Sequence, residues 1–312
     1  IKDYKVIVNK STVPIGTAKK VKNIVKRELE LRHASIDFDV VSNPEFLREG
    51  TAVEDFLRPD RIVIGADSEK AKVIMKEIYR SFILNQNPVL FMNHGDAEMI
   101  KYASNAFLAN KISFMNEIAN ICNNLGVNVD EVKKGMVLDP RIGKQYLYPG
   151  IGYGGSCLPK DVKSLIEISK EVNYDPILLE AINLVNEKQS YEFFKKIKNY
   201  YLSKGGLDNR LLTMWGLSFK PETDDIREAP SLKLIENLLN EKTRLNVYDP
   251  KAMENVREYF GNKINYINDQ YKALQNSDGL ILVTEWGDFR TPDFDRIKSS
   301  LKVPVIFDGR NV

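Results

Sequence analysis

The sequence has few of the side chains that bind transition metals or form disulfides. It contains two histidines and two cysteines among 312 residues. His33 and His94 cannot supply a histidine-rich metal site, so we predict no metal ion. Cys122 and Cys157 lie far apart in the chain and do not make a disulfide framework, which favours a reducing, cytoplasmic setting.

An excess of one charge and a long apolar segment are also absent. The 45 basic residues nearly balance the 43 acidic ones, for a net charge of +2. This balance gives no electrostatic reason to expect nucleic acid or an anionic membrane as the main partner. No apolar run reaches the length that crosses a bilayer. The chain begins at Ile1, without methionine and almost directly with a strand pattern, so we expect that the natural N-terminal part is missing.

What is present is an alternation of strand and helix patterns in both outer parts of the chain. In the first ninety residues, amphipathic helices separate short apolar runs at 5–8, 38–42, 61–65 and 88–92. Beyond the glycine-containing stretch 203–209, the alternation resumes with strand patterns at 211–219, 244–250, 279–286 and 303–310. This order predicts an α/β fold with two doubly wound, Rossmann-like units of parallel sheet, the first of them truncated at its N-terminus.

The middle of the chain is predicted to be helical. Residues 96–125 contain neither proline nor glycine, Asp96 and Glu98 favour a helix N-terminus, and Gly126 ends the pattern. A helix of this length suggests a spine shared by two domains or two subunits. We therefore predict three domains, at 1–93, 94–202 and 203–312.

The segment "GIGYGGSCLPKD" (150–161) contains a GxGxxG pattern that resembles a dinucleotide-binding turn. That turn needs a strand before it and a helix that starts at its last glycine. Here Pro149 precedes the glycines, and a helix is expected only near Lys160. We interpret the segment instead as a loop whose glycines allow close approach to a ligand and which brings Cys157 to a helix N-terminus.

Cys157 has two interpretations. Pro159 suits the first turn of a helix whose N-terminus stabilises a thiolate, and Lys160 and Asp161 add charge nearby, as around a nucleophilic cysteine. The alternative is an inert thiol in a glycine-rich turn. For Cys122, which lies among apolar residues, a buried structural thiol is the preferred interpretation.

Further polar residues lie on one helix face and directly after predicted strands, where a catalytic or ligand-binding site is favoured. Lys101 and Asn105 share one face of the long helix, either as a solvated pair or as a cation and an amide directed at a developing oxyanion. Three segments follow predicted strands, where open α/β sheets bind ligands: "STVP", "SNPEFLREG" with Glu45 and Glu49, and "SFKPETDDIREAP" with Lys220 and Arg227. Their charges are either solvated or act in acid–base chemistry and binding.

A set of segments in a fixed order covers nearly the whole chain. They are "KSTVPIGT", "SNPEFLREGTAVEDFLRPDRIVIG", "IKYASNAFLANKISFMNEIA", "DPRIG", "GYGGSCLPKD", "GLSFKPETDDIREAP", "VYDP" and "IFDGRN". In this order they resemble the UDP-glucose 6-dehydrogenases, within the UDP-glucose/GDP-mannose dehydrogenase family.

This resemblance implies an NAD-dependent enzyme that oxidises the C6 alcohol of a UDP-sugar to a carboxylate. Cys157 would attack the intermediate aldehyde to form a thiohemiacetal, and a second hydride transfer would give a thioester that water hydrolyses. Lys101 and Asn105 would stabilise oxyanions, and Asp161, Glu45 and Thr12 would handle protons and water.

The resemblance also implies binding residues. The substrate set is Glu45, Phe46, Leu47, Arg48, Glu49, Lys101, Asn105, Arg141, Tyr148, Gly150, Gly152, Tyr153, Gly154, Phe219, Lys220 and Arg310. The NAD set is Ser11, Thr12, Val13, Glu49, Cys157, Lys160 and Arg227. Arg141 would reach the substrate of the partner subunit in a homodimer built on the helix near 96–125.

One departure and several alternatives follow. The family's N-terminal βαβ segment, with its glycine fingerprint and ribose-binding acid, has no counterpart in this sequence, so we expect the natural protein to be an active dehydrogenase and the chain as given to lack activity. GDP-mannose and UDP-N-acetylmannosamine are alternative substrates, although "SNPEFLREG" and "DRIVIG" favour UDP-glucose. A hydroxy-acid dehydrogenase has no use for Cys157. A sugar-nucleotide-binding or dimerisation module without catalysis is the alternative from another class.

Overall fold

The computed structural model describes residues 3–82 and 88–312, and these divide into two compact units. The first unit comprises Ile1–Ala106 and Ser164–Asp175, and the second comprises Phe107–Lys163 and Pro176–Val312. The division falls within two helices, α4 (His94–Leu125) and α6 (Leu158–Glu171). The long pattern expected at 96–125 is thus one helix, which begins two residues earlier than predicted.

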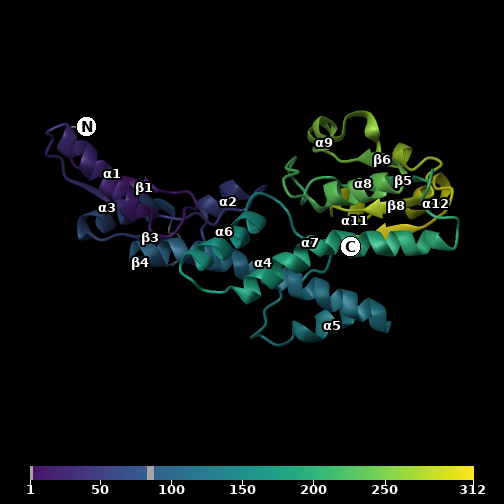
Figure 1. Cartoon of the computed structure of the whole chain (residues 1–312), viewed down its shortest axis with the longest axis horizontal. Coiled ribbons are helices and arrows are strands. Elements are labelled where there is room, and N and C mark those ends of the chain that lie inside the picture. The colour runs from purple at the N-terminus through teal and green to yellow at the C-terminus, as the bar shows by residue number, and fades with distance from the viewer. Residues whose placement is uncertain (1–2, 83–87) are drawn as a thin grey trace. The chain divides into compact units, whose positions relative to one another are not determined.

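The first unit is built on a sheet with the strand order β1-β2-β3-β4. Figure 1 labels β1, β3 and β4 of this sheet. Its strands are β1 (Lys5–Asn9), β2 (Phe38–Ser42), β3 (Ile62–Gly65) and β4 (Val89–Met92). The crossover helices α1 (Thr17–Leu31) and α3 (Glu69–Tyr79) join the parallel pairs β1–β2 and β3–β4, and η1 (Arg80–Phe82) follows α3. The apolar core lies between this sheet and α3, with Val41, Ile64 and Met75 among its buried residues.

One pairing in this sheet differs from the prediction of wholly parallel strands. β2 pairs with β3 in the antiparallel sense, through Ser42 and Gly65. The link between them holds only the six-residue helix α2 (Ala52–Leu57) and irregular segments. A parallel pair needs a full crossover connection, usually a longer helix, and this link does not form one.

Glu98 connects three elements of the first unit. Its carboxylate accepts hydrogen bonds from the backbone of Gly16 (2.6 Å) and Ala18 (3.0 Å) and from the Ser42 hydroxyl (3.1 Å). Glu98 was expected to favour the N-terminus of its own helix α4. It instead binds the N-terminus of α1, where unsatisfied N–H groups and the helix dipole stabilise a negative charge, and so fixes α4 beside the ends of β1 and β2.

The sheet of the second unit is parallel throughout, with the strand order β7-β6-β5-β8-β9. Its strands are β5 (Leu211–Trp215), β6 (Arg244–Tyr248), β7 (Asn265–Tyr266), β8 (Gly279–Leu282) and β9 (Ile306–Asp308). The order reverses between β5 and β8, which makes that position the topological switch point where open α/β sheets bind ligands. The predicted doubly wound parallel unit is confirmed here.

Helices cover both faces of this sheet. α7 (Ile177–Leu202), α8 (Pro230–Asn240) and α9 (Met253–Phe260) pack on one face, where Leu212 and Met214 of β5 are buried. α10 (Gln270–Ala273), α11 (Gly287–Arg290) and α12 (Phe294–Ser300) lie against a second core around Trp215. Successive β5 residues thus enter opposite cores, as the two-residue repeat of a strand requires. The unit also contains α5 (Val129–Met136) and η2 (Gly261–Lys263).

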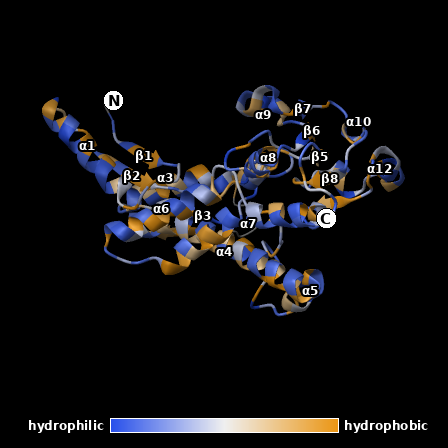
Figure 2. Ribbon diagram, turned by 45° about the vertical axis from the view of Figure 1, so that its right-hand side comes forward, coloured by the Kyte–Doolittle hydropathy of each residue, from blue (hydrophilic) through white to orange (hydrophobic). Residues whose placement is uncertain are grey.

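No helix within residues 3–82 and 88–312 combines the length and the apolar character needed to cross a membrane. Figure 2 shows polar residues distributed along both long helices, α4 and α7.

Candidate active site

Cys157 occupies the residue before α6, and its side chain is exposed. Its carbonyl accepts the Asp161 N–H (2.9 Å), the first hydrogen bond of the helix, and its sulfur lies 3.6 Å from the Ser156 hydroxyl. The helix starts at Leu158 rather than near Lys160, and Pro159 lies in its first turn as expected. Cys157 thus lies at the end of α6 whose first N–H groups carry partial positive charge. Cys122 is buried, as predicted.

Asp161 is the buried carboxylate of this first turn. It is 1% exposed and pairs with the Lys160 ammonium at 2.6 Å. One helical turn separates Asp161 from Cys157, so an acid–base group and a thiol occupy the same helix end.

Three side-chain amides from α4 and α7 hold the loop that precedes Cys157. Asn116 accepts the Gly150 N–H (2.7 Å), and Gln189 donates to the Gly150 carbonyl (2.7 Å). Asn186 bonds to both the N–H (2.8 Å) and the carbonyl (3.0 Å) of Tyr153. Burial raises the pKa of the Tyr153 phenol to about 12, so this ring stays neutral at physiological pH.

Two glycines of this loop are packed tightly against the segment after β5. A Cβ on Gly155 would lie 2.6 Å from the Phe219 ring, and one on Gly154 would overlap the Glu228 carbonyl. Gly155 also has φ +84°, which few other residues adopt. The two glycines therefore let the cysteine loop pack closely against the segment after β5. The loop does not have the geometry of a pyrophosphate-binding turn.

The space at Gly154 leads to a prediction about stability. We expect Gly154→Ala to lower the free energy of unfolding by about 3 kcal/mol, since the backbone of residue 228 has to move to admit the methyl group. Gly135→Ala is the matched control in the same unit, because nothing lies within 4 Å of a Cβ there. It lies inside α5, where the change should stabilise the protein by about 0.5–1 kcal/mol. Urea denaturation of both variants measures the difference, and equal stabilities would contradict the tight packing.

In the first unit, several predicted residues gather at the carboxyl ends of β1 and β2. Ser11, Thr12 and Val13 line one small cavity with Lys101, and the Lys101 ammonium lies 3.3 Å from the Glu45 carboxylate. Lys101 is 3% exposed and Asn105 8%. The alternative of a solvated helix face is therefore wrong: this is a buried cation and a buried amide one turn apart on α4.

Two residues that the sequence did not single out belong to this cluster. Asn9 lines the same cavity, and its side-chain nitrogen is buried and has no hydrogen-bond partner in the described part of the chain. Burial lowers the pKa of the Lys10 ammonium, against the opposing effect of the Glu45 carboxylate. Because a buried donor without a partner is costly, Asn9 is suited to a hydrogen-bond acceptor on a ligand.

Three arginines of the predicted site are held by aspartates near them in sequence. The hydrogen-bonded pairs are Arg48–Asp55, Arg141–Asp139 and Arg227–Asp225. Hydrogen bonds from Arg48 and Arg141 lower the pKa of Asp55 and of Asp139. For Asp225, burial favours a higher pKa, but the Arg227 bonds outweigh it. These pairs fix each guanidinium in one orientation.

Arg310 lies at the switch point of the second sheet. Its guanidinium donates to the carbonyls of Val283 (2.6 Å), Phe219 (2.7 Å) and Gly152 (3.4 Å), and it pairs with Glu285 at 3.2 Å. It thus joins the ends of β5 and β8 to the cysteine loop. Phe219, Arg310 and the glycine loop, which are far apart in sequence and all belong to the predicted substrate set, are in contact.

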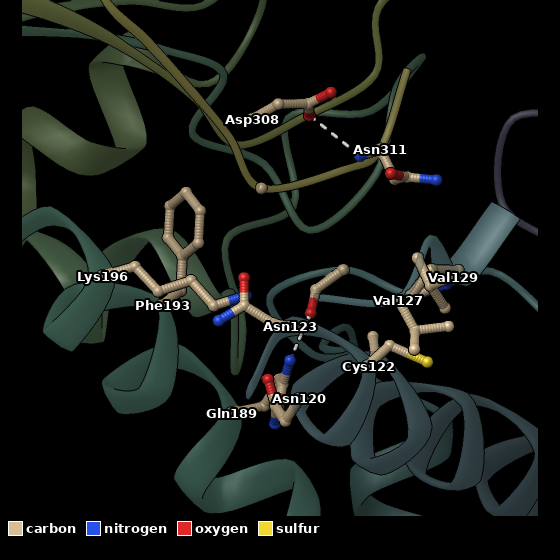
Figure 3. Close-up of a pocket in the computed structure, with 14 residues that line it drawn as sticks. Asn120, Cys122, Asn123, Val127, Val129, Gln189, Phe193, Lys196, Asp308 and Asn311 are labelled. Carbon is tan, nitrogen blue, oxygen red and sulfur yellow. Dashed lines mark hydrogen bonds between the residues drawn. The ribbon is translucent and has the colours of Figure 1, made fainter. Parts of the chain in front are cut away.

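A cavity of about 220 Å³ opens beside Gly150. Figure 3 shows its lining, with Asn120 and Gln189 on one side and Asp308 and Asn311 on another. Both ends of the cavity carry hydrogen-bonding groups, and Phe193 supplies an apolar wall. This mixture is common in binding sites for small polar molecules.

Comparison with known protein families matches most of the chain in three parts. Within the UDP-glucose/GDP-mannose dehydrogenase family, residues 1–83 match the NAD binding domain, 95–188 the central domain and 213–312 the UDP binding domain. The chain belongs to this family. Ser11, Thr12 and Glu45 thus lie in the NAD binding domain, Lys101 and Cys157 in the central domain.

Individual relatives agree with this family assignment. The UDP-glucose 6-dehydrogenase of Pseudomonas aeruginosa is 44% identical over 98% of this chain and 68% of its own length. That of Rhizobium meliloti is 42% identical over 100% of this chain and 70% of its own. A UDP-glucose dehydrogenase structure from Pyrobaculum islandicum is 38% identical, with a TM-score of 0.88, over 99% of this chain and 68% of that one. The chain therefore spans about two thirds of the length of these relatives.

Proposed function

We propose that this protein is an NAD-dependent UDP-glucose 6-dehydrogenase. The observation that carries the proposal is the 44% identity to such an enzyme over 98% of the chain. The structure supplies a matching thiol, since Cys157 is exposed at the N-terminus of α6. Bound NAD⁺ supplies a hydride acceptor for each of the two oxidations. Ser11, Thr12 and Val13, with the open donor of Asn9 beside them, fit its nicotinamide side.

The chain's own residues account for the other steps. The Cys157 thiolate adds to the C6 aldehyde to give a thiohemiacetal, which loses hydride to become a thioester. Water then attacks the thioester, which releases the carboxylate and regenerates the thiol. Lys101 and Asn105 donate to the oxyanions, and Asp161, Glu45 and Thr12 hold protons and water.

We propose the predicted sets as binding residues. For the nucleotide sugar these are the loop Tyr148–Gly154, the segment Glu45–Glu49, and Phe219, Lys220 and Arg310, with the cavity beside Gly150 as part of the site. NAD also contacts Glu49, Lys160 and Arg227. The proposed domains are 1–93, 94–202 and 203–312. The proposed location of the protein is the reducing environment of the cytoplasm.

The test is NADH formation from UDP-glucose, with binding of UDP-glucose and of NAD⁺ measured separately by calorimetry. Two NADH per sugar support the four-electron oxidation. Turnover with GDP-mannose or UDP-N-acetylmannosamine alone would overturn the choice of substrate. Binding of UDP-glucose without NAD⁺ binding or turnover would make the chain a binding module.

We also propose a homodimer through α4, in which Arg141 reaches the partner's substrate. Phe107, Phe114 and Ile121 are 63%, 45% and 48% exposed and recur every seven residues, so they form one apolar stripe on the helix. A stripe of this kind is typical of a helix that packs against another.

The stripe gives a prediction about assembly. Phe114→Glu should convert the dimer to a monomer in sedimentation velocity, because a charge replaces an aromatic ring in the interface. Phe294→Glu is the control, since Phe294 is 63% exposed on α12, away from the stripe. A Phe114→Glu variant that sediments as the wild type does would exclude this interface.

A further inference from the structure

Asp249 is a buried carboxylate to which the proposed reaction assigns no role. It directly follows β6, is 1% exposed, and lies beside the turn that leaves β5. In dinucleotide-binding units of this topology, an acidic residue beyond the first strand–helix turn accepts hydrogen bonds from the ribose. Asp249 follows the second strand of its unit, where such a residue is expected.

The carboxylate of Asp249 is already used by the protein. Its donors are Leu217 N (2.7 Å), Ser218 N (3.3 Å), Trp286 Nε1 (3.3 Å), Lys251 N (2.9 Å) and Ala252 N (2.8 Å). The Ser218 hydroxyl lies 3.3 Å from the same carboxylate and 2.9 Å from the Lys220 carbonyl, and its one proton can go to either. A carboxylate offers about four lone-pair sites, so these donors leave none for a ribose hydroxyl. The acid at the ribose position therefore binds the protein's own backbone.

The bonded backbone is the turn that leads into Phe219 and Lys220. Thr284 holds the same turn from β8, donating to the Ser218 carbonyl at 2.7 Å. Gly216 begins the turn with φ +91°, and a Cβ there would lie 2.5 Å from Thr284. With Asp249 on the β6 side and Thr284 on the β8 side, the path of the chain into residues 219 and 220 is fixed.

We propose that Asp249 is a positioning residue of the UDP site. It holds the turn 216–220 in the conformation that presents Phe219 and Lys220 to the uridine diphosphate, while its carboxylate closes the pocket that a dinucleotide ribose would enter. The inference rests on the UDP-sugar function proposed above. An amide has one oxygen and one NH₂ group, so at this position its nitrogen faces the N–H groups either of Leu217 and Ser218 or of Lys251 and Ala252, and the bonds on that side are lost. In either orientation the amide also lacks the negative charge that strengthens the bonds to the turn.

Calorimetric titration of the purified chain with UDP tests this role. Asp249→Asn should weaken UDP binding at least about tenfold, because a turn that contributes ligand contacts loses charged hydrogen bonds. Asp278→Asn is the matched control. Asp278 is a buried carboxylate on the same sheet, 6% exposed, and it accepts the Leu211 N–H at the opposite end of β5. The Asp278→Asn substitution should lower the midpoint of thermal unfolding and leave the Kd for UDP within about twofold of the wild-type value.

The outcomes separate this inference from the proposed function. If the wild-type chain does not bind UDP, the proposed function fails. If the wild type binds and Asp249→Asn binds equally well, or if Asp278→Asn weakens binding as much, the positioning role is wrong. Should Asp249→Asn not fold, Ser218→Ala replaces it, since it removes the hydroxyl that lies between the Asp249 carboxylate and the Lys220 carbonyl and so helps to hold the turn. Full affinity in Ser218→Ala would then overturn the proposal.

Discussion

Replacing Cys157 by serine should reduce NADH formation from UDP-glucose by at least about a thousandfold, the scale on which a lost nucleophile affects an enzyme. A serine hydroxyl is not ionised near neutral pH and is a much weaker nucleophile than a thiolate, so the aldehyde is not held for a second hydride transfer. The second NADH per sugar and the acyl-enzyme adduct in intact-mass measurements should both disappear.

Cys122→Ala provides the control for the loss of a thiol. Cys122 is buried at 6% exposure, whereas Cys157 is exposed, so iodoacetamide should alkylate the native protein at Cys157 first. Cys122→Ala should keep wild-type turnover. Normal stoichiometry in Cys157→Ser would remove the covalent mechanism, whereas loss in both variants would point to general destabilisation.

Lys101→Met should lower kcat by about a hundred- to a thousandfold, with a smaller change in the KM for UDP-glucose. The Lys101 ammonium is buried beside Glu45, so its charge is little screened by water and stabilises a developing oxyanion strongly. Its removal also leaves the Glu45 carboxylate without its ion-pair partner.

Lys76→Met is the matched control, because Lys76 is an exposed lysine of α3 in the same unit. It should leave both kinetic constants unchanged. An increase in KM alone in Lys101→Met would mean that Lys101 binds substrate and transition state equally, and the oxyanion role would then be wrong.

The order of helices and strands follows from local patterns, because apolar runs and helical repeats reflect burial on one face. Residues 211–219 and 244–250 illustrate this, since β5 and β6 begin where the patterns do. The antiparallel pairing of β2 with β3 depends on the path of the connecting chain, which no local repeat encodes. The two-residue shift in the start of α6 arises because Cys157 itself occupies the N-terminal cap.

The candidate site could be predicted only in part. Cys157, Lys101 and Asn105 stand out in the sequence because a thiol at a helix end and a polar pair in an apolar stretch are unusual, and their catalytic roles remain predictions. Glu98 and Asp249 were missed, since a carboxylate in sequence looks the same whether it is solvated or bound to distant backbone groups. Asn116, Asn186 and Gln189 gave no signal either, because amides on helices are ordinary surface residues.

The amides that hold the cysteine loop have a consequence for how specificity can diverge. The hydrogen bonds from these amides go to the main chain of the loop and not to its side chains; the residues are Asn116, Asn186 and Gln189. The loop's path is therefore set from the helices, and its N–H groups at Gly150 and Tyr153 should exchange slowly with deuterium although they lie outside regular secondary structure. Tyr148, which is 54% exposed, can be replaced without moving that path. If Tyr148 contacts the nucleotide sugar as proposed, single substitutions there would change the contacts with the sugar on an unchanged backbone.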